Sequence, residues 1–254
     1  LMLSPTAGLD PQMLLDVRPL AAQILTALEN NPRFHDLSPK FALSLDGGEG
    51  LVMLEHPHDL WLSALQIDGE VLLGFGLAGC PADDAPLAAV PVANGLELVL
   101  AVLELFLDIA RPEQVRMRHL LAEQSPEQML QQLQMRLGFP LRADQKVTSW
   151  RRQAIVANQH IGIYPQHEPG KVAVGGVAPL GRLDPAMLTS VAQLAADFGD
   201  GSLRLTPWQS LLLPNVPVER APQVLQALQT AGLLCSAELP LTQIIACTGS
   251  TECV

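Results

Sequence analysis

Residues 202–213 read SLRLTPWQSLLL, and this stretch decides how the second half of the chain folds. Successive side chains of a β-strand point to opposite faces of the sheet. Alternate residues therefore fall into two sets: Arg204, Thr206 and Trp208 on one face, and Leu203, Leu205 and Pro207 on the other. The second set predicts a core face. The first set offers a guanidinium and a hydroxyl, with Gln209 at the following turn, and this face either binds an anion or is an ordinary solvated face.

The segments around this stretch predict a small α/β unit. Residues 161–164 and 171–177 are short apolar runs typical of strands. Asp184 and Pro185 supply an N-cap and a first-turn proline for a helix that we expect to end near residue 198. A further helix is expected over 218–230. This order of elements predicts a sandwich in which the helices cover one face of a sheet.

The first 158 residues predict a second mixed α/β unit. A helix is expected over 14–28, and the alternation of Phe41, Leu43 and Leu45 indicates a strand. Two apolar runs joined by Asp68-Gly69-Glu70 predict a hairpin. The later expected elements are a helix over 91–110, a helix over 126–137 and a polar connector over 141–158.

The chain ends with two cysteines in the spacing C-x5-C, Cys247 and Cys253, separated by small or polar residues. Thiolates bind iron, and small neighbours let backbone N–H groups approach the sulfur. Two thiols cannot complete a zinc site or an iron–sulfur cluster, so the pair is either incidental or part of a metal site. We favour the metal site. Cys80 and Cys235 stand alone and are expected to be buried apolar thiols.

Composition excludes several classes of function. The 254 residues carry a formal net charge of −11 and have no cluster of basic residues, which argues against a nucleic-acid partner. No apolar run reaches the roughly 18–20 residues of a membrane span. The start of the chain lacks the pattern of a secretion signal and a starting methionine, so we expect a cytoplasmic location and a chain that begins inside a longer protein.

Four stretches together resemble the nitrite/sulfite reductase superfamily, and most closely its precorrin-3B synthase branch. They are Leu37-Ser38-Pro39-Lys40-Phe41 after Asn31-Pro32, Asp46-Gly47-Gly48 with the segment from His56 to Leu62, the Arg204-x-Thr206-x-x-Gln209 strand, and Ala246 to Cys253. The last stretch matches the first half of the family's C-x5-C … C-x3-C motif. The C-x3-C half is absent, and Ala42 stands where reductases usually carry a second lysine.

The resemblance implies an α+β fold in three parts. Residues 1–158 would form a reductase-like mixed α/β domain, 159–238 a ferredoxin-like half-domain, and 239–254 the start of a cluster-binding repeat. Cys247 and Cys253 would be two ligands of a [4Fe–4S] cluster. Lys40, Arg204, Thr206 and Gln209 would bind an anionic tetrapyrrole, and no residue is assigned to catalysis.

The implied function is an oxidoreductase of cobalamin biosynthesis, an O₂-dependent monooxygenase acting on precorrin-3A, with non-haem iron as a further cofactor. Ala42 favours this interpretation, because a reductase needs several cations around its bound anion. The alternatives are a sirohaem-dependent sulfite or nitrite reductase and a non-catalytic α/β module. Either enzyme would need an electron donor such as ferredoxin or a flavoprotein. We expect the chain to be inactive by itself.

Overall fold

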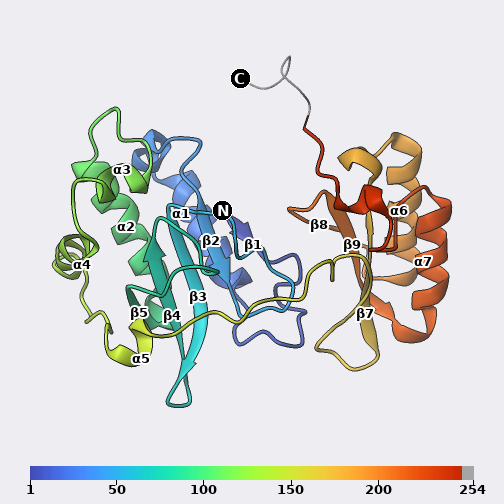
Figure 1. Cartoon of the computed structure of the whole chain (residues 1–254), viewed down its shortest axis with the longest axis horizontal. Helices are drawn as coiled ribbons and strands as arrows, with labels where there is room; N and C mark the ends of the chain where they lie inside the picture. The colour runs from blue at the N-terminus through green and yellow to red at the C-terminus, as the bar shows by residue number, and fades with distance from the viewer. Residues whose placement is uncertain (248–254) are drawn as a thin grey trace. The chain divides into compact units, whose positions relative to one another are not determined.

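The computed structural model describes residues 1–247, which form two compact units, each described separately. Unit 1 comprises residues 1–8 and 12–154. Unit 2 comprises residues 9–11 together with the chain from residue 155 onward. Both units combine one sheet with α-helices (Figure 1), which confirms the predicted α+β class.

Unit 1 is built on a sheet in the order β1-β2-β3-β4-β5. Its strands are β1 (Met2–Leu3), β2 (Leu43–Asp46), β3 (Leu60–Ile67), β4 (Glu70–Leu77) and β5 (Ala88–Pro91). The first three strands pair in parallel, and β3, β4 and β5 pair antiparallel. The β3–β4 hairpin confirms the prediction. Asp68 and Gly69, at φ values of 55° and 84°, form a two-residue turn whose left-handed backbone matches the twist of the strands.

Helices cover one face of this sheet. They are α1 (Arg18–Asn30), α2 (Gly95–Ile109), α3 (Met117–Leu121) and α4 (Pro126–Gln134), and α5 (Gln145–Thr148) lies further along the chain. Leucines of β2 and β3 and Phe75 of β4 pack in one apolar cluster with α1, α2 and α4. Two expected boundaries are wrong. The helix expected from residue 91 begins at Gly95, because Pro91 ends β5 and pairs with Leu72 of β4. The helix expected from residue 14 begins at Arg18, and the N–H groups of Leu14 and Leu15 donate to the carbonyl of Gly47.

The predicted polar connector is also wrong, because its middle covers the second face of the sheet. Val147 of α5 is fully buried in a cluster with Leu65 and Leu72, and Trp150 packs against it. Arg142 bridges to Ala89 of β5 through two backbone hydrogen bonds. Residues 141–153 therefore belong to the packed body of unit 1.

Unit 2 is a sheet in the order β6-β7-β9-β8 with two helices on one side (Figure 1). Its elements are β6 (Gly162–Pro165), β7 (Lys171–Val177), α6 (Pro185–Phe198), β8 (Arg204–Leu205), β9 (Ser210–Pro217) and α7 (Ala221–Thr230). The strands are antiparallel. Asp184 caps α6 by accepting a hydrogen bond from Met187 N–H at 2.8 Å, as the sequence predicts. Val174, Leu211 and Leu213 face the helices in one apolar cluster.

Candidate functional site

Residues 202–213 form a hairpin whose tight turn, residues 206–209, includes the turn expected at Gln209 but begins inside the expected strand. Strands β8 and β9 pair at Arg204 with Leu212 and at Leu205 with Leu211. Thr206 N–H donates to the Ser210 carbonyl at 2.9 Å, and Gln209 adopts a left-handed backbone at φ 55°. The turn therefore gathers the polar residues of this stretch at one end of the sheet.

Arg204 lies on the sheet face that α6 and α7 leave uncovered. Leu211 and Leu213 of β9 face the helices, so Leu212 between them points to the other face of the sheet. Arg204 pairs with Leu212, and paired residues share a face. The expected core face is only partly correct. Leu203 packs against the helix-facing cluster, whereas Leu205 is 75% exposed because β8 is a two-residue edge strand.

A hydroxyl pair and a histidine brace the turn. Thr206 Oγ1 accepts hydrogen bonds from the N–H groups of Trp208 and Ser210 at 3.2 and 3.3 Å. It also lies 2.6 Å from Ser210 Oγ, which lies 2.9 Å from His160 Nδ1. A hydroxyl oxygen has two lone pairs, and both of those on Thr206 are used. Thr206 therefore donates to Ser210 Oγ. Ser210 Oγ and His160 Nδ1 share a further hydrogen bond, in which the tautomer of the ring decides which group donates.

The His160 ring is neutral because it is buried. The ring is buried and stacks on the Trp208 indole, with centroids 4.8 Å apart and planes 10° from parallel. Burial lowers the pKa of His160 to about 4, so the ring stays neutral around pH 7.

Gln209 connects the turn to the segment before the terminal cysteines. Its Nε2 donates to the carbonyl of Ala246 at 2.7 Å, and its Oε1 accepts from the N–H of Ala246 at 3.0 Å. Cys247, the next residue, is exposed. A side chain at Gly181 would lie 2.4 Å from Gln209 Oε1, so that glycine leaves room for the amide. The structure therefore brings Thr206, Gln209 and the residue before Cys247 into one hydrogen-bonded group.

Two family models match the chain in order. Residues 1–141 match the nitrite and sulphite reductase 4Fe-4S domain, and residues 164–231 match the nitrite/sulfite reductase ferredoxin-like half domain. The first match alone covers more than half of the chain. The chain belongs to the nitrite/sulfite reductase family. The resemblance seen in the sequence is confirmed at this level.

Relatives and a solved structure extend the family match. The chain is 31% identical over 272 aligned residues to a chloroplastic ferredoxin–nitrite reductase of Zea mays, and 28% identical over 267 to a ferredoxin–nitrite reductase of Synechococcus elongatus. Each alignment covers 98% of this chain, but only 47% and 51% of the two relatives. The NirA protein of Mycobacterium tuberculosis shares the fold, with a TM-score of 0.78 at 23% identity over 98% of this chain and 46% of that one. The chain thus spans about half the length of these family members.

The cofactor residues predicted from the sequence are only partly described. Cys247 is exposed, and Cys253 lies outside the described residues. Within residues 1–247 no group of three or more His, Cys, Asp or Glu side chains is arranged to hold a metal ion. The described part of the chain therefore offers one thiolate to a cluster. Cys80 and Cys235 are buried as expected, and burial raises the pKa of Cys235 to about 11.

The predicted tetrapyrrole-binding residues differ in how the structure uses them. Lys40 is exposed in the turn before β2, and Arg204 is half-buried on its sheet face. The Thr206 hydroxyl and the Gln209 amide are engaged with the protein itself. Contact of any of these four side chains with a tetrapyrrole stays a prediction.

A polar cluster inside unit 1 was not predicted, although Asp46 at its centre belongs to the Asp46-Gly47-Gly48 motif. The Asp46 carboxylate lies between Ser63, at 2.8 Å, and Arg152, whose Nε donates at 2.7 Å. Arg152 also donates to the carbonyl of Glu49 at 2.5 Å. Burial, and then the neighbouring Asp46, raise the pKa of Glu49 to about 8. His160 was missed for a similar reason, because its partner Ser210 is 50 positions away.

The pair of histidines His56 and His58 gives no metal site. His58 Nδ1 lies 2.7 Å from the carbonyl of His56, and burial lowers the pKa of His58 to about 4.

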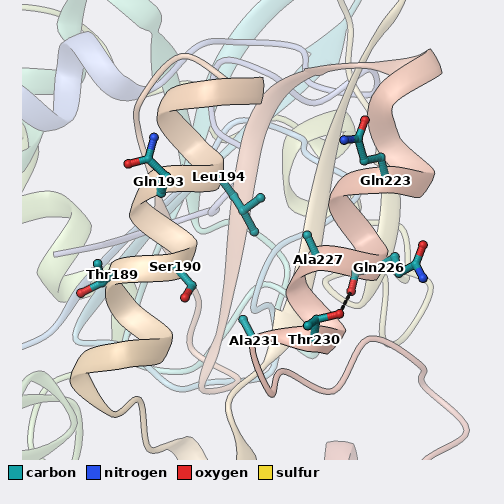
Figure 2. A pocket seen from close by; sticks show the side chains of 9 residues that line it. All are labelled: Thr189, Ser190, Gln193, Leu194, Gln223, Gln226, Ala227, Thr230 and Ala231. Atoms are coloured by element: carbon teal, nitrogen blue, oxygen red, sulfur yellow. Dashed lines mark hydrogen bonds between the residues drawn. The ribbon is translucent and has the colours of Figure 1, made fainter.

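A separate groove of about 680 Å³ runs between α6 and α7 (Figure 2). Its lining is neutral, chiefly amide, hydroxyl and small side chains, so it offers no group for acid–base or redox chemistry.

No helix within residues 1–247 has both the length and the apolar character that crossing a bilayer requires.

Proposed function

We propose that this chain is part of a sirohaem- and [4Fe–4S]-dependent oxidoreductase that takes electrons from ferredoxin and reduces nitrite. One observation carries the proposal: 98% of the chain aligns with proteins named ferredoxin–nitrite reductase, at 31% identity for the Zea mays protein. The two family models match in the order expected of that family.

This proposal replaces the precorrin-3B synthase interpretation, because the named relatives favour the reductase alternative. One observation keeps the synthase as a second candidate. Ala42 follows Lys40 where the resemblance implies a second lysine, and the Ala42 N–H is bonded to Asp59 Oδ2 at 2.7 Å inside unit 1. The methyl side chain there cannot contribute a positive charge to an anion site.

The chemistry of the described residues fits the two cofactors. A tetrapyrrole such as sirohaem carries several carboxylates, and Arg204 and Lys40 each offer a cation suited to such groups. Cys247 offers an exposed thiol, which as thiolate is the usual ligand of iron–sulfur clusters. When bound, the sirohaem and the cluster would supply the electron transfer, and this chain's residues would hold and orient them.

The test is a spectrum and a turnover assay on the holoenzyme that contains this chain. We expect sirohaem bands together with iron–sulfur absorption, and nitrite-dependent oxidation of reduced ferredoxin that exceeds the rate with sulfite. A faster rate with sulfite would overturn the choice of substrate. Cluster absorption without sirohaem, with O₂-dependent turnover of precorrin-3A, would establish the synthase instead. A protein that binds neither iron nor a tetrapyrrole would support the third interpretation, a non-catalytic α/β module.

A further inference from the structure

The Gln209 amide holds the backbone of Ala246 in the way that a neighbouring strand would. It satisfies both polar groups of that residue, donating to the carbonyl at 2.7 Å and accepting from the N–H at 3.0 Å. Turning the amide over would set donor against donor and acceptor against acceptor, so only one orientation is possible. The contact therefore fixes both the position and the direction of the chain at Ala246.

The Gln209 amide is in turn held in place by its own turn and by the space at Gly181. Gln209 adopts a left-handed backbone, φ 55°, at the end of the turn. The turn is braced by the Thr206 hydroxyl, which accepts from Trp208 and Ser210, and by His160 behind Ser210. Gly181, at φ 67°, leaves the space that Oε1 occupies, because a side chain there would come within 2.4 Å of it.

Packing contributes little to the segment that Gln209 holds. Ile245 is 63% exposed, and Cys247 is exposed as well. A ligand of a metal cluster must be held within about 0.5 Å of its place if the cluster is to bind tightly. The two hydrogen bonds hold Ala246, which directly precedes Cys247. They therefore act next to the thiol whose position matters.

We propose that Gln209 is a positioning residue, which fixes the backbone at Ala246 so that the Cys247 thiolate meets the cluster. The proposal rests on the proposed function, since that function makes Cys247 a cluster ligand. It gives the glutamine of the Arg-x-Thr-x-x-Gln stretch a role toward the cluster instead of the tetrapyrrole.

The first test compares Gln209→Ala and Gln209→Glu with the native holoenzyme. Alanine removes both hydrogen bonds. Glutamate keeps an acceptor for the Ala246 N–H but sets a carboxylate oxygen against the Ala246 carbonyl. We expect amide exchange over residues 244–247 to become on the order of tenfold faster in both variants, since two hydrogen bonds are lost or opposed. Iron release to a ferrous chelator should accelerate by a similar factor.

Gln226→Ala is the matched control. Gln226 is an exposed side chain of α7 that lines the groove between α6 and α7 (Figure 2). This variant should keep the native exchange and iron-release rates. If Gln209→Ala behaves like Gln226→Ala in both measurements, the positioning role is refuted.

A pair of glycines gives an independent test. Gly181→Ala should push the Gln209 amide from its place and reproduce the faster exchange and iron release. Gly201→Ala places the same side chain on a similar backbone, φ 79°, but into open space, so it should leave residues 244–247 unchanged. Equal behaviour of the two glycine variants would count against the proposal.

Cys247→Ser separates this inference from the proposed function. We expect that variant to lose most of its cluster iron. Full retention of iron and sulfide would overturn the assignment of Cys247, and with it the proposed function. Loss of iron in Cys247→Ser, together with native exchange in Gln209→Ala, would overturn only the role of Gln209.

Discussion

In unit 1 two deeply buried carboxylates lie against arginines, whereas in unit 2 the site turn is braced by neutral groups. Asp46 and Asp59, whose side chains are 0% and 2% exposed, pair with Arg152 and Arg116. In unit 2, His160, Ser210 and Thr206 are linked by hydrogen bonds without a formal charge at neutral pH.

The two arrangements differ in how much stability is lost when one partner is removed. A buried ion pair stabilises little by itself, but removing one partner leaves a charge without water or counter-ion. A neutral network costs less to disrupt, because an unsatisfied hydroxyl loses only its hydrogen bond and hydration. The comparison predicts that unit 1 is more sensitive to loss of a charged partner than unit 2 is to loss of its histidine.

Arg152→Met should have the largest effect. The substitution keeps much of the side-chain volume and leaves the Asp46 carboxylate buried without its cation. We expect urea unfolding of the chain to show a loss of about 3–5 kcal/mol in unit 1. Arg151→Met is the control, because Arg151 is exposed and donates only to the carbonyls of Thr148 and Trp150.

A double variant shows whether charge is the cause. Asp46→Asn combined with Arg152→Met removes both charges, and it should recover part of the stability that Arg152→Met loses. If the double variant is less stable than Arg152→Met, the hydrogen bonds that the Asp46 carboxylate accepts from Ser63 and the Gly48 N–H outweigh the cost of its unpaired charge.

Glu49→Gln should change how stability depends on pH. In the described residues, Glu49 Oε2 accepts from the Gly47 N–H at 2.7 Å, and Oε1 is buried without a hydrogen-bond partner. The pKa of Glu49 is about 8 in the folded chain, against an ordinary value of 4.5 in the unfolded chain, so the folded state holds an extra proton between these values. Stability should therefore fall as pH rises from about 4.5 to 8, by up to about 1.4 kcal/mol per pH unit.

The glutamine variant cannot ionise, so its stability should lack this decline. Urea unfolding at several pH values between 5 and 8 measures the difference between the native chain and the variant. Glu55→Gln, at an exposed position of the same unit, should follow the native curve. Parallel curves for Glu49→Gln and the native chain would mean that Glu49 is ionised when folded.

Local chemistry explains which elements the sequence predicted. Asp68-Gly69 between two apolar runs suits one kind of tight turn, so the β3–β4 hairpin follows from a few neighbouring residues. Asp184 and Pro185 likewise fix the start of α6. The strand at residues 88–91 was missed because Ala-Ala-Val-Pro has no strong preference of its own, and it is a strand because it pairs with β4.

The parts of the site that could not be predicted depend on contacts between distant residues. Arg152 is 106 positions from Asp46, and nothing in residues 141–158 marks the one arginine that becomes buried. Gln209 was predicted as a ligand of the tetrapyrrole from the motif alone. Its contact with Ala246, 37 positions away, depends on a turn that breaks the expected strand. Pattern and spacing give residue types, but such pairings come from the packed structure.

Substitution of His160 should have the smallest effect on stability. Its contribution to stability should depend on pH in the direction opposite to that of Glu49. His160→Ala leaves the Ser210 hydroxyl without its hydrogen-bond partner, and we expect a loss of about 1–3 kcal/mol in unit 2 at pH 7. His160→Asn keeps a hydrogen-bonding group close to the position of Nδ1 and should lose less. The folded pKa of about 4 lies below the ordinary value of 6.5, so only the unfolded chain gains the proton between these values. Native stability should therefore fall as pH drops from about 6.5 to 4.

The asparagine variant should lose this acid-side decline, because it carries no titrating ring. His58 of unit 1 shares the lowered pKa, so the test is the difference between the native chain and His160→Asn at each pH, which cancels the contribution of His58. Amide exchange over residues 204–217, which carry β8 and β9, would report on unit 2. An unchanged acid-side decline in His160→Asn would show that folding does not lower the pKa of the His160 ring.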